Sequence, residues 1–203
     1  NMALNFANNN SLSAISAKPS GLSGGILNLI ATQTASGSST ISFASGIDST
    51  YDEYVIKLIN CHPSSSASFM FNMSIDSGSN YNVTKTTTYF RAYHQENGGG
   101  GVLAYDTFDL AQSTAFQDLT GDSVSTDSDH GVSGSIHLFN PSSTTFVKHF
   151  IANINSIKGG SSSEMKNSYS AGYGNTTSAV NAVQFKFDSG TIQSGVIKLY
   201  GVS

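Results

Sequence analysis

The sequence has no tryptophan, a single cysteine and three prolines in 203 residues. One cysteine, Cys61, excludes an internal disulfide and any cysteine-rich metal site, and we expect it to be a small buried apolar residue. Basic residues are also few: nine Lys and Arg against thirteen Asp and Glu give a net charge of -4, and Arg91 is the only arginine. Nucleic-acid binding needs a cluster of basic residues that neutralises phosphates. The scattered basic residues form no such cluster, so no nucleic acid is expected as a partner.

Long apolar runs are absent as well. No stretch approaches the roughly 20 apolar residues of a membrane-spanning helix, and the N-terminus lacks the charged and apolar regions of a secretion signal. We therefore expect a soluble chain without membrane insertion. Charged residues make up 11% of the chain, against roughly a quarter in an ordinary soluble domain. Ser, Thr and Asn, together about a third of the residues, supply polarity instead and, with 20 Gly, favour strands and turns over helices.

The chain divides into two parts, an N-terminal arm or linker over residues 1–25 and a β-sandwich domain over residues 26–203. Apolar residues in the first part are too sparse for a core face, and they read either as anchors on a partner surface or as part of a disordered tail. Gly21 to Gly25 match the five-residue pattern of a hydrolase nucleophile elbow around Ser23. That elbow needs a strand before the serine and a helix after it, which this segment does not offer, so we interpret it as linker.

Period-two alternation of apolar and polar residues is the main structural signal. Tyr54, Ile56 and Leu58 would share one face of a strand, and the near-continuous apolarity of residues 54–59 indicates a central position. The same alternation over residues 182–187 and 196–202, separated by Asp188-Ser189-Gly190, predicts two strands that form a C-terminal hairpin. The last strand carries apolar residues almost to its end and is expected to contribute to the core.

About ten or eleven short strands separated by turn residues point to an all-β fold, a jelly-roll-like antiparallel β-sandwich. Further strands are expected at residues 26–30, 40–43, 68–75, 82–91, 134–139, 144–155 and 169–173. Residues 95–101 read as a glycine-rich loop. Residues 106–118 are the only segment in which a helical turn or two is expected.

Candidate catalytic and metal-binding residues are weakly patterned. None of the five histidines forms a pair with the spacing of zinc ligands, and His137 and His149 lie in predicted strands, where a structural role is expected. Residues 127–131, which begin within the acidic loop 122–130, resemble the start of a calcium loop, but Leu138 stands where an EF-hand would place its glutamate. Calcium binding by this loop stays open. No catalytic residue, metal ligand or cofactor is predicted, and an enzyme with a carboxylate pair is the third alternative.

Tyrosine is the more informative residue type, with nine copies. An aromatic ring with a polar tip can stack on a sugar while its hydroxyl forms hydrogen bonds. We therefore take Tyr93, Tyr105, Tyr169 and Tyr173, which are expected near loops at one end of the sandwich, as candidate ligand-binding residues. For each of them the alternative is a structural tyrosine at the rim of a sheet.

Several segments resemble a family of virion structural proteins from tailed phages, especially marine ones. The resemblance rests on residues 51–54 (Tyr-Asp-Glu-Tyr), 74–81, 171–173 and the closing segment 189–201. It spans roughly Ile26 to Val202, and residues 2–13 are also similar to the start of these proteins. It implies a structural protein of the virion, located in the tail, a fibre or the capsid surface. The motifs are structural, so no functional residue follows from them.

Together these observations predict a non-enzymatic virion protein, a tail fibre or capsid decoration, that is exposed on the particle. We expect a homotrimer whose partners are other virion proteins and, through host attachment, host-surface glycans. The alternative is a carbohydrate-binding adhesion module that binds by many weak copies on one particle.

Overall fold

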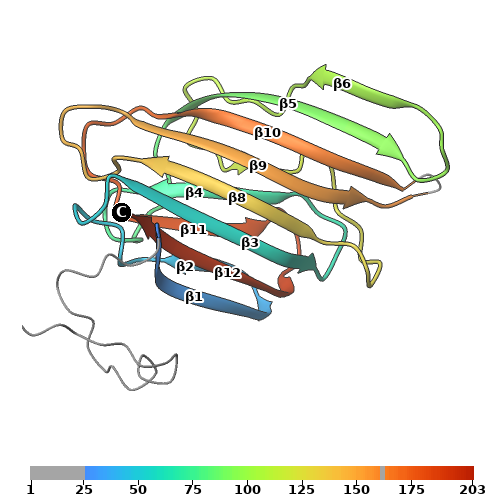
Figure 1. The fold of residues 1–203 in the computed structure, drawn as a ribbon, viewed down its shortest axis with the longest axis horizontal. Helices are drawn as coiled ribbons and strands as arrows, with labels where there is room; N and C mark the ends of the chain where they lie inside the picture. The colour runs from blue at the N-terminus through green and yellow to red at the C-terminus, as the bar shows by residue number, and fades with distance from the viewer. Residues whose placement is uncertain (1–25, 161–162) are drawn as a thin grey trace, which may run out of the picture.

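The computed structural model describes residues 26–160 and 163–203, in which the chain forms strands, turns and no helix. The N-terminal arm of residues 1–25, with its nucleophile-elbow pattern, lies outside the described residues. Two antiparallel sheets pack face to face (Figure 1). The all-β sandwich expected from the sequence is confirmed.

The larger sheet has eight strands in the order β1-β12-β3-β8-β9-β10-β5-β6. Its strands are β1 (Leu27–Ser38), β12 (Ile192–Val202), β3 (Glu53–Pro63), β8 (Val132–Phe139), β9 (Lys148–Lys158), β10 (Glu164–Gly174), β5 (Lys85–Gln95) and β6 (Gly101–Tyr105). The smaller sheet has the order β2-β11-β4-β7. Its strands are β2 (Ile41–Phe43), β11 (Ala182–Phe187), β4 (Phe69–Ser74) and β7 (Gln117–Asp118).

The smaller sheet lies behind only part of the larger one, so that the strands around β5 and β6 extend beyond it (Figure 1). Phe69, Phe71 and Phe185 of the smaller sheet are fully buried, and Phe71 meets Phe150 of β9 with ring centroids 5.2 Å apart. Tyr54, Ile56 and Leu58 are buried as the alternation predicts, on a strand that lies between β12 and β8. The core therefore forms where apolar faces of both sheets meet.

The predicted C-terminal hairpin is wrong. Both of its strands exist, but β11 pairs with β2 and β4 in the smaller sheet, whereas β12 pairs with β1 and β3 in the larger one. The intervening turn crosses between the sheets and is bound to residues 64–68: the Asp188 amide donates to the Ser68 carbonyl at 3.0 Å, and Asp188 Oδ1 accepts from the Ser68 amide at 3.0 Å. Turn residues reverse the chain both in a hairpin and in a crossing between sheets. Local sequence therefore does not choose the partner strand. The core role of the last strand is confirmed.

Two other expectations need correction. Residues 106–118 form no helical turn; they run as a loop that ends in the short strand β7. The loop is held by hydrogen bonds to β5, including one in which the Thr87 amide donates to the Leu110 carbonyl at 2.8 Å. The first strand is longer than the expected residues 26–30: β1 continues to Ser38, which still pairs with Ile192.

Candidate functional site

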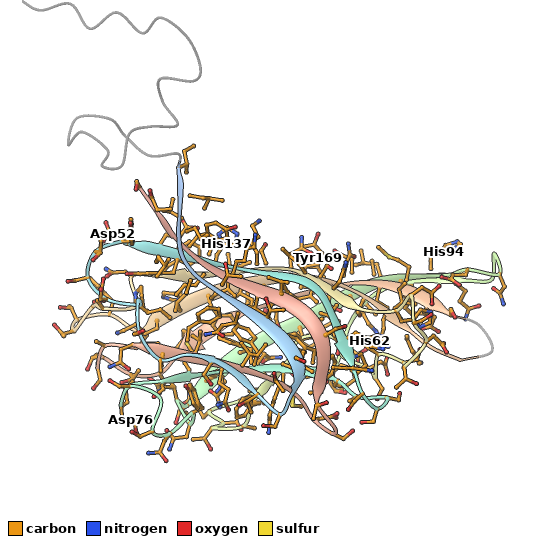
Figure 2. All side chains as sticks on the ribbon, turned by 90° about the horizontal axis from the view of Figure 1, so that it is seen from below. Asp52, His62, Asp76, His94, His137 and Tyr169 are labelled. Carbon is orange, nitrogen blue, oxygen red and sulfur yellow. The ribbon has the colours of Figure 1, made fainter. Side chains whose placement is uncertain are left out.

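The outer face of the larger sheet presents the side chains that point away from the sandwich. On β10, Lys166, Ser168 and Ser170 are buried and point inward, so that Asn167 and Tyr169 between them point outward. Figure 2 shows Tyr169, His137 and His94 on the same side of the molecule, opposite Asp76. Register places the outward residues of β9, β10, β5 and β6 in rows across the sheet.

One such row is aromatic. Tyr169 pairs with Phe90, and Phe90 pairs with Tyr105. The rings of Phe90 and Tyr169 stack with centroids 4.9 Å apart and planes inclined by 9°. Phe90 is 41% exposed and Tyr105 62%. The Tyr105 hydroxyl donates to Asp109 Oδ2 at 2.6 Å, and this hydrogen bond raises the pKa of Tyr105. The row is thus an exposed aromatic surface with a fixed geometry.

A group of amides adjoins the aromatic row. Asn153 pairs with Tyr169, and Asn155 pairs with Asn167. Asn167 Nδ2 donates to Asn153 Oδ1 at 2.7 Å and to Asn155 Oδ1 at 3.2 Å. Since each amide has a carbonyl and an NH₂ group, these bonds orient the Nδ2 donors of Asn153 and Asn155 away from Asn167.

Beyond the amides the surface is hollowed into a groove of about 850 Å³. Its walls include Asn60, His62, Asn155, Met165 and the loop around His130. His62 Nδ1 lies 2.7 Å from the His130 carbonyl oxygen, which ties the loop to β3. Most residues that line the groove are of polar types, and the groove is continuous with the amides because Asn155 belongs to both.

The structure brings together some of the tyrosines selected from the sequence. Tyr105 and Tyr169 flank Phe90 on the outer face, whereas Tyr173 lies further along β10 beside His149, with ring centroids 6.1 Å apart. Tyr93 pairs with Val102 on the opposite face and meets the Arg91 guanidinium at 5.5 Å. All four lie in strands, and Tyr93, Tyr105 and Tyr173 are within two residues of a strand end, near loops as expected. They do not gather at one end of the sandwich, because Tyr93 and Tyr173 lie toward opposite ends of the β5–β10 pair. Phe90 and the asparagines were missed, because only the strand register brings them beside Tyr169.

The strongest charged cluster lies on the inner side of β5 and β10. Asp122 is paired with Arg91, with Lys166 Nζ at 2.5 Å and, more distantly, with Lys158 Nζ at 4.0 Å; Asp106 binds Arg91 Nε at 2.9 Å. Burial alone would raise the pKa of Asp122, but the hydrogen bonds from Lys166 and Arg91 lower it. Both carboxylates face cations, so the cluster is suited to holding the loops that carry Asp106 and Asp122 onto the larger sheet.

The acidic loop forms its own hydrogen bonds. Ser125 Oγ lies 2.9 Å from Asp127 Oδ2 and 2.6 Å from His130 Nδ1. Asp122 faces the cations described above, and residues 26–160 and 163–203 contain no group of three His, Cys, Asp or Glu that could hold a metal ion. Calcium binding by this loop stays the open alternative that the sequence leaves.

The other residues singled out from the sequence have structural positions. His137 and His149 lie in β8 and β9 as expected. Cys61 is fully buried, and burial raises the pKa of its thiol to about 12.

Across the described part of the chain, no helix is long and apolar enough to cross a membrane. Comparison with known proteins finds no family model, no curated protein and no solved structure that matches this chain.

Proposed function

We propose that this protein is a non-enzymatic structural component of a tailed-phage virion, exposed on the particle surface. The observation that carries the proposal is the strand pairing of the sandwich. β1 pairs with β12, β2 with β11, β3 with β8 and β4 with β7. This is the nested pairing of one long hairpin rolled over two sheets. It gives the order β1-β12-β3-β8 in one half of the larger sheet and β2-β11-β4-β7 in the smaller sheet.

We interpret that order as a jelly-roll order, and jelly rolls are an architecture of viral capsid proteins and lectins. In this interpretation β5 with β6 and β9 with β10 are two inserted hairpin-like pairs that widen one sheet. Because one fold hosts many functions, the location in the virion rests on the sequence resemblance to phage structural proteins as well. The low charge of the surface suits a protein that packs against copies of itself, as in the homotrimer expected from the sequence.

The test is to look for the protein in particles. An antiserum raised against the purified chain should detect it in gradient-purified particles of the phage that encodes it, and gold-labelled antibody should bind intact particles. Detection in the lysate but not in purified particles would overturn the proposal. A chain reduced to residues 26–203 should fold, and its failure to enter particles would assign docking to residues 1–25.

Carbohydrate binding for host adhesion is the second candidate. The observation that favours it is the exposed stack of Phe90 and Tyr169 with Tyr105 beside it. Aromatic faces of this kind pack on the apolar faces of sugar rings. Virion location and adhesion are compatible, since many weak sites on one particle bind by avidity.

A further inference from the structure

The aromatic row, the amides and the groove lie side by side on the outer face of the larger sheet. We propose that they form one binding track for a neutral oligosaccharide chain, which runs from the groove across the sheet to the β6 edge. We define the binding track as Asn155, Asn167, Asn153, Tyr169, Phe90 and Tyr105. This inference rests on the carbohydrate-binding role given above as the second candidate.

The first argument is the chemistry of the six side chains. Sugars offer hydroxyls that both donate and accept hydrogen bonds, together with apolar ring faces. The Nδ2 donors of Asn153 and Asn155 and the phenolic hydroxyls match the hydroxyls, whereas the stacked rings of Phe90 and Tyr169 match the ring faces. None of the six side chains is charged at neutral pH, so the track favours a neutral sugar over an acidic one.

The second argument is preorganisation. The amides are oriented by their mutual hydrogen bonds, the rings by stacking, and Tyr105 by its bond to Asp109. All six lie on paired strands of the sheet, which hold them in register. A ligand would therefore lose less binding energy to the ordering of these side chains than it would on a flexible loop.

The third argument is extent. From Asn153 on β9 to Tyr105 on β6 the row crosses three inter-strand spacings, about 14 Å. The groove of about 850 Å³ begins at Asn155 and extends this path toward β3. A single sugar would cover only part of the track, so binding should strengthen as the chain lengthens.

The absence of tryptophan provides a direct test. A Tyr169→Trp variant carries one tryptophan in the track and keeps an aromatic ring there. Its emission should shift when neutral oligosaccharides from an array-selected panel are added, and the shift should saturate at lower concentration for longer chains. Tyr93→Trp, on the opposite face of β5, is the matched control and should not respond.

Substitutions then identify the track in the otherwise unchanged chain, displayed in multivalent form on an array of neutral and acidic glycans. Phe90→Ala, Tyr169→Ala and Asn155→Ala should each weaken binding at least about fivefold, and Tyr93→Ala should leave it unchanged. The substituted side chains of the track are outward, so thermal unfolding should show that all variants fold.

The outcomes distinguish a failure of the binding track from a failure of the proposed adhesion role. Binding that none of the three track substitutions weakens would overturn the track and leave adhesion at another site. Binding restricted to acidic glycans would overturn the neutral class. A silent array with the multivalent wild type would overturn both the track and the adhesion role, without bearing on the presence of the protein in particles.

Discussion

Lys85 is a fully buried residue whose charge state depends on the fold. Its Nζ donates to Asn72 Oδ1 at 2.5 Å and to the Val83 carbonyl at 2.8 Å, with no carboxylate among these partners. Burial lowers the pKa of Lys85 from 10.5 to about 7. Between these two values the unfolded chain binds more protons than the folded chain, so this residue makes stability rise with pH.

Replacing Lys85 by methionine should remove this pH dependence. From pH 7 to pH 10 the wild type should gain stability through Lys85, whereas Lys85→Met should not. The free energy of unfolding of the variant minus that of the wild type should therefore fall by about 1–3 kcal/mol over this range, because each pKa unit corresponds to about 1.4 kcal/mol. Urea unfolding at several pH values measures the difference. Lys198→Met, on the outer face of β12, is the control and should show a much smaller change. A constant difference for Lys85→Met would contradict the assigned cause.

Gly172 shows a different constraint, set by the backbone of the neighbouring strand. A Cβ atom at this position of β10 would lie 2.3 Å from the Thr86 carbonyl oxygen and 2.8 Å from Thr87 Cα. Because strand backbone cannot move aside alone, Gly172→Ala should destabilise the protein by about 2 kcal/mol. At Gly100 no atom lies within 4 Å of such a Cβ, so Gly100→Ala should change stability by less than about 0.5 kcal/mol. Equal midpoints of the two variants in urea would refute this reason.

At the scale of elements, β12 comes last in the sequence but is an interior strand of the larger sheet. It lies between β1 and β3, so its removal would leave both of them without a partner on that side. A chain that ends at residue 191 should therefore show no cooperative unfolding transition. Shortening the β5–β6 turn at residues 96–100 is the control, since it leaves every strand in place. A cooperative thermal transition in the truncated chain would show that β12 is dispensable.

The same strand shows what could be predicted from the sequence. Alternation identified the strand and its buried face, because side-chain direction is a local property with period two. Its partner was predicted wrongly, because Asp188-Ser189-Gly190 specifies a chain reversal and says nothing about which sheet receives the next strand. The prediction of a helical turn at residues 106–118 failed for a related reason: the spacing of apolar residues fits a helix, but hydrogen bonds to β5 hold the segment as a loop.

At the scale of the whole molecule, the candidate site also has a part that local sequence predicts and a part that it does not. Tyr105 and Tyr169 could be selected from the sequence by residue type alone. Phe90 and Asn153 join them only through the register of β9, β10, β5 and β6, which come from two separate parts of the chain. The groove depends on the packing of β3, β12 and the loop around His130 and has no local signature.

The assembly expected of a virion protein gives the last prediction. Exposed apolar side chains gather at the start of β1, an edge strand, where Ile26 is 74% and Leu29 57% exposed. We expect the proposed homotrimer to bury this edge, so light scattering coupled to size exclusion should give three times the 21.2 kDa mass of the chain. Because the contact would be apolar, the mass should not change between low and high salt.

Two substitutions on opposite edges of the larger sheet test where the copies meet. Leu29→Lys on β1 should shift the mass toward that of a single chain, because assembly would bury an unpaired charge. Leu103→Lys on β6, where the leucine is 76% exposed, should leave the trimer intact. The reverse result would place the interface at β6, beside Tyr105, and the copies would then cover one end of the binding track. A wild-type chain that remains monomeric would instead favour a subunit that assembles only on the particle or an isolated binding module.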